Sequence, residues 1–102
     1  MALDFYNSKD RKEHMFALES KQLCALVEII SEFEKWTGIF FNEYGDFTLD
    51  RGSQQALLKI IGNYIQKSDL NINKEKTVEI LSFYSLLRYF YNRDIVLYAF
   101  GD

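Results

Sequence analysis

The sequence lacks proline altogether and contains a single cysteine among its 102 residues. No proline-bearing linker, repeat or low-complexity tract divides the chain, and its length provides for one hydrophobic core, so we predict one domain over residues 1–102. A lone cysteine excludes an intramolecular disulfide and fits a reducing compartment. The residue is Cys24. Because Leu23, Ala25 and Leu26 surround it in a helical pattern, we expect a small core side chain there.

Histidine is equally scarce, and this removes most catalytic chemistry. The one histidine, His14, lies in a charged turn, so a Cys–His nucleophile pair with Cys24 is not expected. One histidine without a cysteine pair does not supply the usual ligands of a transition metal. No serine stands in a nucleophile-elbow sequence. We therefore expect no cofactor and no metal site of this kind.

Long hydrophobic runs are also missing. No stretch approaches the roughly 20 apolar residues that a membrane span requires, and residues 1–20 contain no apolar run of signal-peptide length. We therefore expect a cytoplasmic protein that does not contact membranes. The net charge of −3 and the isoelectric point near 5.1 argue against nucleic-acid binding, which depends on clustered lysine and arginine. A basic partner is expected instead.

The sequence is rich in apolar and aromatic residues, which are 48% and 17% of the chain and suffice to offset the entropy of folding. Apolar residues recur at helical spacing in three segments, near residues 19–37, 51–66 and 74–91. Gly38 is the expected C-cap of the first helix, and Asp50 and Asn73 are the expected N-caps of the other two. The buried stripe of the first helix is predicted to be Leu23, Leu26, Val27, Ile30 and Phe33.

Three other segments favour strands, namely residues 3–6, 39–49 and 95–100. The second reads as two short β-prone runs around a glycine-containing turn, which is typical of a hairpin or of a strand and a turn. Residues 15–17 fit either a further short strand or the approach to the first helix. The predicted fold class is α+β, with three helices packed on a small sheet. An all-α bundle with extended connections is the alternative.

The negative charge is concentrated in one window of the chain. Residues 28–50 contain six acidic residues and one basic residue, a net of −5, whereas the whole chain carries −3. The carboxylates of Glu43, Asp46 and Asp50 fall around the predicted turn, beside Tyr44. They are either a solvated acidic turn, a protein-binding patch, or carboxylates for acid–base or metal-assisted catalysis. Their spacing does not match a calcium-binding loop.

Two helical faces also point to a partner. Glu28 and Glu32 are four residues apart on the first predicted helix, and such a like-charge pair costs about 0.3 kcal/mol unless a positive group offsets it. Apolar residues cover more than half the circumference of the third predicted helix. That helix is therefore either central in the fold or offers a face to a partner, for example in a homodimer.

Four fragments carry a likeness to a known group of proteins. They are Leu-Asp-Phe-Tyr at residues 3–6, Lys-Trp-Thr-Gly-Ile at 35–39, Glu-Tyr-Gly-Asp-Phe-Thr-Leu at 43–49 and Phe-Gly-Asp at 100–102. With these fragments the chain resembles small bacterial immunity proteins of contact-dependent or secreted toxin systems. The resemblance implies a stoichiometric inhibitor that binds a cognate toxin domain, often a nuclease, and blocks its active site.

The sequence therefore predicts a non-catalytic inhibitor of a basic toxin domain, because an acidic, aromatic surface imitates phosphate charge and fills a substrate cleft. The first-choice contact residues are Glu43, Tyr44, Asp46 and Asp50, with Glu28 and Glu32 as auxiliary charges. Two other classes stay open. One is a small carboxylate-based or metal-dependent enzyme that uses the same residues, and the other is a regulatory or dimerising module that uses the third helix.

Overall fold

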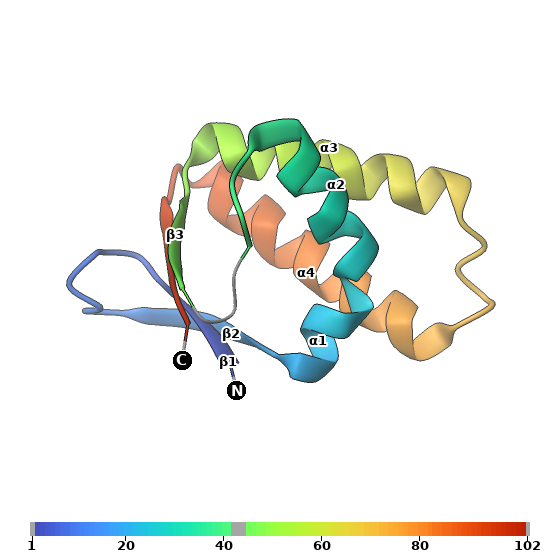
Figure 1. Cartoon of the computed structure of the whole chain (residues 1–102), viewed down its shortest axis with the longest axis horizontal. Helices are drawn as coiled ribbons and strands as arrows, with labels where there is room; N and C mark the ends of the chain where they lie inside the picture. Colours follow the sequence, from blue (N-terminus) through green and yellow to red (C-terminus); the bar gives the residue numbers. More distant parts are fainter. Residues whose placement is uncertain (1, 42–44, 102) are drawn as a thin grey trace.

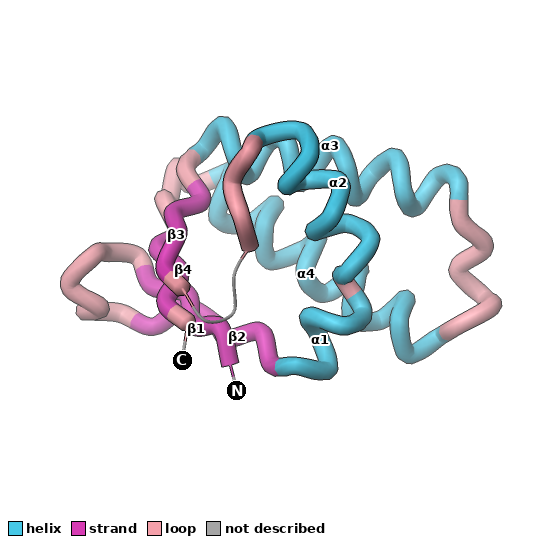
Figure 2. Tube along the Cα trace, viewed as in Figure 1, coloured by secondary structure: helices cyan, strands magenta, loops and turns pink. Residues whose placement is uncertain are grey.

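The computed structural model describes residues 2–41 and 45–101, and it confirms the α+β prediction (Figure 1). A four-stranded antiparallel sheet lies at one end of the molecule, and the helices pack against one of its faces (Figure 2). The elements in chain order are β1 (Ala2–Tyr6), β2 (His14–Glu19), α1 (Ser20–Ala25), α2 (Val27–Thr37), β3 (Asp46–Leu49), α3 (Arg51–Lys67), α4 (Lys74–Asn92) and β4 (Leu97–Phe100). Within the described ranges, no helix has both the length and the apolar character needed to cross a membrane.

The sheet has the strand order β2-β1-β4-β3, so that the first and last strands of the chain pair at its centre. Side chains alternate between its two faces, as the pleat requires. In β1, Leu3 and Phe5 are fully buried against the helices, whereas Asp4 and Tyr6 lie on the outer face. The cross-strand register places four more side chains on that outer face, those of Tyr98, Phe100, Asp46 and Thr48.

The predicted helix caps are confirmed. Gly38 ends α2 in the left-handed conformation, with φ of 74°, and its N–H donates to the carbonyl oxygen of Glu34. The Asp50 carboxylate accepts a hydrogen bond from the Ser53 backbone N–H at 2.9 Å at the start of α3. Asn73 caps α4 in the same way. These boundaries depend on contacts between residues close in sequence, which is why the sequence predicts them.

The single helix predicted over residues 19–37 is wrong, because the chain forms two helices with a break at Leu26. There the backbone N–H bonds to two carbonyls at once, those of Gln22 and Leu23. The break lets α1 contact β2 and α4 while α2 lies against α3. It also changes which residues are buried. Cys24 is exposed and Val27 is 58% exposed, so the prediction that both are core residues is wrong.

The sequence left two structures open for residues 39–49, and of these the hairpin is wrong. β3 forms the second half of the segment and pairs with β4, whereas residues 39–41 form no strand. These residues instead place Phe41 in the core, in ring contact with Phe5, Phe33, Phe47 and Phe83. The predicted turn falls mainly on residues 42–44, which lie outside the described residues. Residues 15–17, whose structure the sequence left open, belong to strand β2.

One buried amide joins α3 to the sheet. The Gln54 side chain is fully buried, and its amide nitrogen donates to the carbonyl oxygens of Leu49 and Ile95, both at 2.8 Å. These bonds fix the start of α3 against the end of β3 and the segment before β4. The position of α3 beside the sheet depends on this anchor as well as on the aromatic core.

Candidate functional site

The four predicted contact residues that the structure describes do not gather into one patch. Glu43 and Tyr44 lie outside the described residues. Asp46 lines a hollow on the outer face of the sheet, and Glu28 and Glu32 line a groove between α2 and α3. The two depressions share no lining residue. Asp50 lines neither, because its side chain caps α3.

Asp50 has a structural role. The hydrogen bond from the Ser53 backbone N–H is the main cause that holds the pKa of Asp50 below its ordinary value. A negative side chain at a helix N-terminus also interacts favourably with the helix dipole. The carboxylate is exposed, but it is already engaged by the helix that it begins.

Replacing Asp50 with alanine is expected to lower the free energy of unfolding by about 1 kcal/mol at neutral pH, because α3 loses its cap. The folded-state pKa lies below the unfolded-state value, so the charge stabilises the fold above about pH 4 and this contribution is lost as the pH falls through the folded-state pKa. Urea unfolding at neutral and acidic pH measures both effects. The Asp50→Asn variant, which keeps a capping oxygen, is the control. Equal stability of the alanine variant and the parent at neutral pH would contradict the capping role.

The hollow that contains Asp46 already holds positive charge. It has a volume of about 270 Å³ and is lined by Lys9, Tyr98 and Phe100 among others. The guanidinium of Arg11 lies over the Phe100 ring, 4.1 Å from its centroid. Because lysine and arginine side chains occupy this side of the sheet, it is a poor match for the basic partner that the sequence predicts.

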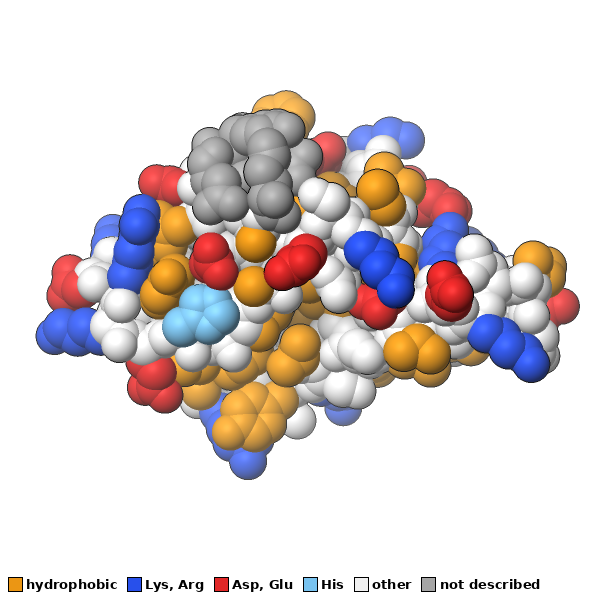
Figure 3. All heavy atoms as spheres, turned by 90° about the horizontal axis from the view of Figure 1, so that it is seen from below, with side chains coloured by type: hydrophobic (Ala, Val, Ile, Leu, Met, Phe, Trp, Pro, Cys, Tyr) orange, Lys and Arg blue, Asp and Glu red, His pale blue; other side chains and the backbone are white. Residues whose placement is uncertain are grey.

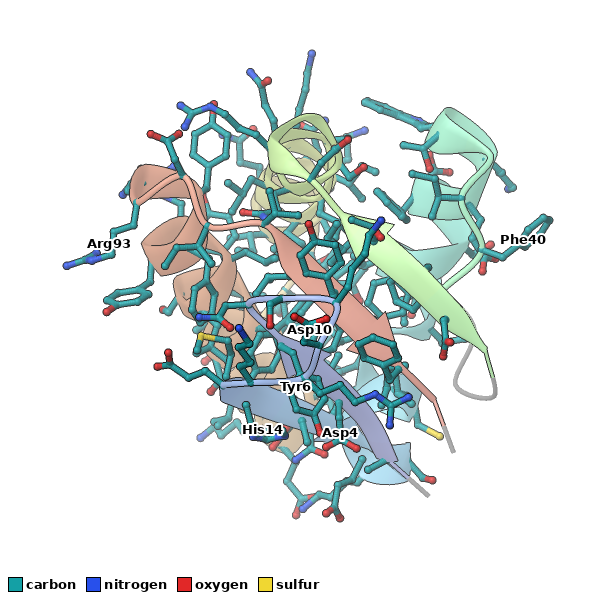
Figure 4. The ribbon with its side chains drawn as sticks, turned by 90° about the vertical axis from the view of Figure 1, so that its left-hand side faces the viewer. Asp4, Tyr6, Asp10, His14, Phe40 and Arg93 are labelled. Atoms are coloured by element: carbon teal, nitrogen blue, oxygen red, sulfur yellow. The ribbon has the colours of Figure 1, made fainter. Side chains whose placement is uncertain are left out.

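The outer face of the sheet also carries a histidine–carboxylate pair, which the sequence analysis did not predict. His14 Nε2 lies 2.9 Å from Asp4 Oδ1, and the Tyr6 ring meets the imidazole edge-on (Figure 4). The pair links the middle of β1 to the first residue of β2. Among the described residues, no third side chain of a metal-binding type joins this pair in a group that could hold a metal ion. The alternation of β1 was the available signal, since it sends Asp4 and Tyr6 to one face.

On the face formed mainly by β2 and α1, acidic, basic and hydrophobic side chains are interspersed (Figure 3). A mixed surface of this kind does not indicate a partner of one charge. In the part of the window 28–50 that the structure describes, the negative charge is spread over α2, β3 and the N-cap of α3. Part of it is used within the fold, since the Glu34 carboxylate accepts the Phe41 backbone N–H at 3.0 Å.

The groove between α2 and α3 combines acidic and aromatic side chains. Its volume is about 300 Å³. Glu28, Glu32 and Trp36 follow one another at intervals of four residues, so α2 presents all three on one side. The remaining lining residues are Ile29, Ile60, Asn63, Tyr64 and Lys67. Trp36 is 52% exposed, which is unusual for so large a ring and is the feature that sequence reasoning missed.

A lysine from α4 forms an ion pair with the carboxylate at one end of this groove. Lys76 Nζ lies 2.5 Å from Glu28 Oε1 and 5.7 Å from the centroid of the Tyr64 ring. The hydrogen bond to Glu28 is the main cause that raises the pKa of Lys76. The positive group that the Glu28–Glu32 pair requires is thus supplied from within the chain. Glu32 itself makes no ion pair with any described residue.

The opposite wall carries lysines. Lys67 lines the groove in the last turn of α3, and Lys59 Nζ lies 6.0 Å from the centroid of the Trp36 ring. Both lysines are exposed, so water screens their charge. The net charge of the groove therefore does not define a partner, and its distinctive feature is the ring and the carboxylate on α2.

Comparison of the chain with models of protein families, with curated proteins and with solved structures gave no significant match. A function can therefore be inferred only from the residues of the chain itself.

Proposed function

We propose that this chain is a non-catalytic, immunity-type protein that binds a cognate, basic toxin domain in the cytoplasm and neutralises it by covering its active site. The observation that carries the proposal is the half-exposed Trp36 in the α2–α3 groove, beside a Glu32 carboxylate that makes no ion pair among the described residues. A large exposed ring is typical of the centre of a protein interface, and an available charge beside it is typical of the rim.

The energetics of interfaces support this choice of surface. Tryptophan is enriched among the few residues that dominate binding energy, because a rigid ring excludes water over a large area. Carboxylates at the rim guide a basic partner and fix its orientation. An interface of about 800 Å² per partner is sufficient for a stable complex, and the whole protein exposes 6084 Å². The groove and its surroundings can supply that area.

A second candidate function is a dimerising module. Val78, Leu81 and Tyr89 are exposed hydrophobic side chains along one side of α4, and no described segment covers them. Sedimentation at increasing protein concentration tests this candidate, since association through this face would produce a dimer. We favour the inhibitor, because the ring on the α4 face, Tyr89, is already covered by the Arg93 guanidinium at 3.9 Å from its centroid, whereas Trp36 lies beside a carboxylate without an ion pair among the described residues.

The direct test is co-expression of the chain with the toxin domain encoded by the neighbouring reading frame. We expect cells that carry both to grow, and cells that carry the toxin domain alone to stop growing. A catalytically inactivated toxin domain should still co-purify with the chain, because binding and not turnover provides protection. Unchanged toxicity with a folded, well-expressed chain would contradict the proposal, as would a gene neighbourhood without any toxin-bearing frame.

A further inference from the structure

We infer that the Trp36 end of the α2–α3 groove is a subsite for an arginine side chain presented by the partner. The identity of that partner depends on the proposed function, whereas the existence of the subsite does not. The molecule already fills one cation site with a lysine of its own, and α2 carries another carboxylate and a ring one helical turn further on.

The filled site is that of Lys76. Its ammonium group lies between the Glu28 carboxylate, at 2.5 Å, and the Tyr64 ring, with 5.7 Å to the ring centroid. A carboxylate and the face of an aromatic ring both attract a cation, and together they hold it more firmly than either alone. The side chain of Lys76 is only 27% exposed, so the cation is partly withdrawn from water.

The second arrangement also offers a carboxylate and a ring, but here both belong to α2. Glu32 and Trp36 follow Glu28 on the same side of the helix, and both line the groove. Tryptophan is the strongest of the aromatic cation acceptors. The cation nearest to its ring is that of Lys59, 6.0 Å from the centroid, at the limit of an effective contact, and Lys59 makes no ion pair with Glu32. The ring and the carboxylate are thus available to a better-placed cation.

Arginine fits this space better than the other basic or apolar side chains. Its planar guanidinium stacks on an indole and can donate two parallel hydrogen bonds to one carboxylate. Asn63 lines the same groove and offers a further acceptor. Lysine would bind as a point charge, without the stacking on the indole and without two parallel hydrogen bonds to the carboxylate. An apolar side chain would remove water from Glu32 without replacing its hydrogen bonds, which is unfavourable.

The test uses N-acetyl-L-arginine methylamide as the probe and the citrulline analogue, its neutral isostere, as the control ligand. Trp36 is the single tryptophan of the chain, so its fluorescence and its indole N–H resonance report on this site alone. We expect saturable changes with a dissociation constant of about 1–10 mM, and no change with the citrulline analogue. Glu32→Gln should weaken binding by about tenfold, and Lys59→Gln should strengthen it, because the internal competitor is removed.

Asp10→Asn is the matched control variant, because it neutralises an exposed carboxylate in the β1–β2 connection, away from the groove. It should leave arginine binding unchanged. Equal responses to the arginine and citrulline probes would overturn the inference, and so would equal affinities of the Glu32→Gln and Asp10→Asn variants. Arginine binding without protection from a toxin would contradict the proposed function but not the subsite. Protection without arginine binding would contradict the subsite alone.

Discussion

Replacing Phe41 with alanine is expected to lower the free energy of unfolding by about 3 kcal/mol. The ring is 7% exposed and contacts Phe5 of the sheet, Phe33 of α2 and Phe83 of α4. Its removal opens a cavity at the point where sheet and helices meet, in a domain whose total stability is expected to be about 5–15 kcal/mol. Urea unfolding followed by circular dichroism gives the difference.

The preceding residue provides the matched control. Phe40 is 71% exposed and points away from the molecule (Figure 4), so its replacement by alanine should change the stability by less than about 0.5 kcal/mol. If the two variants lost the same stability, the core position of Phe41 would be contradicted. The comparison is free of differences in residue type, since both changes remove the same ring.

Reversing the charge of Glu32 is expected to weaken the complex with the cognate toxin domain by about 100-fold. A lysine at this position would face the cation of the partner, and such like-charge contacts cost several kcal/mol when they are removed from water. Glu32 lies on the exposed surface and makes no ion pair among the described residues, so Glu32→Lys should leave the fold intact. Titration calorimetry measures the affinity.

Asp10→Lys makes the same change of charge on the β1–β2 connection and serves as the control. We expect it to retain the affinity of the parent to within about threefold, because a distant exposed charge acts mainly through screened long-range attraction. Equal losses for both variants would mean that net charge, and not the groove, governs binding. No loss for Glu32→Lys would exclude this carboxylate from the interface.

The sequence predicts those features of the fold that depend on neighbouring residues. Asp50 and Gly38 mark helix ends through bonds to residues three or four positions away, and helical spacing identifies the long helices. The break at Leu26 has no such local signal, because α1 and α2 contact different elements. The path of residues 39–41 is likewise set by the core position of Phe41, which overrides the β propensity of the segment.

The same distinction applies to the site. The Glu28–Glu32 pair was interpreted as a sign of a partner, but the positive group beside Glu28 is Lys76 of the same chain, which is distant in sequence and reaches Glu28 through the packing of α4. Trp36 was accessible to sequence reasoning, since it continues the spacing of Glu28 and Glu32 on the polar side of the helix. The cluster of aromatic residues over positions 40–47 was the stronger signal in the sequence. The sequence contains no local signal that α3 forms the second wall of the groove.

If the α2–α3 groove forms the contact with the toxin domain, complex formation must change the surroundings of Trp36. The chain is labelled with 5-fluorotryptophan, which places a single fluorine reporter at Trp36, and fluorine NMR is recorded as unlabelled toxin domain is added. We predict that the resonance shifts in proportion to the complex formed and becomes shielded from a soluble paramagnetic quencher. A complex that forms while the resonance and its accessibility to the quencher stay unchanged would contradict the account.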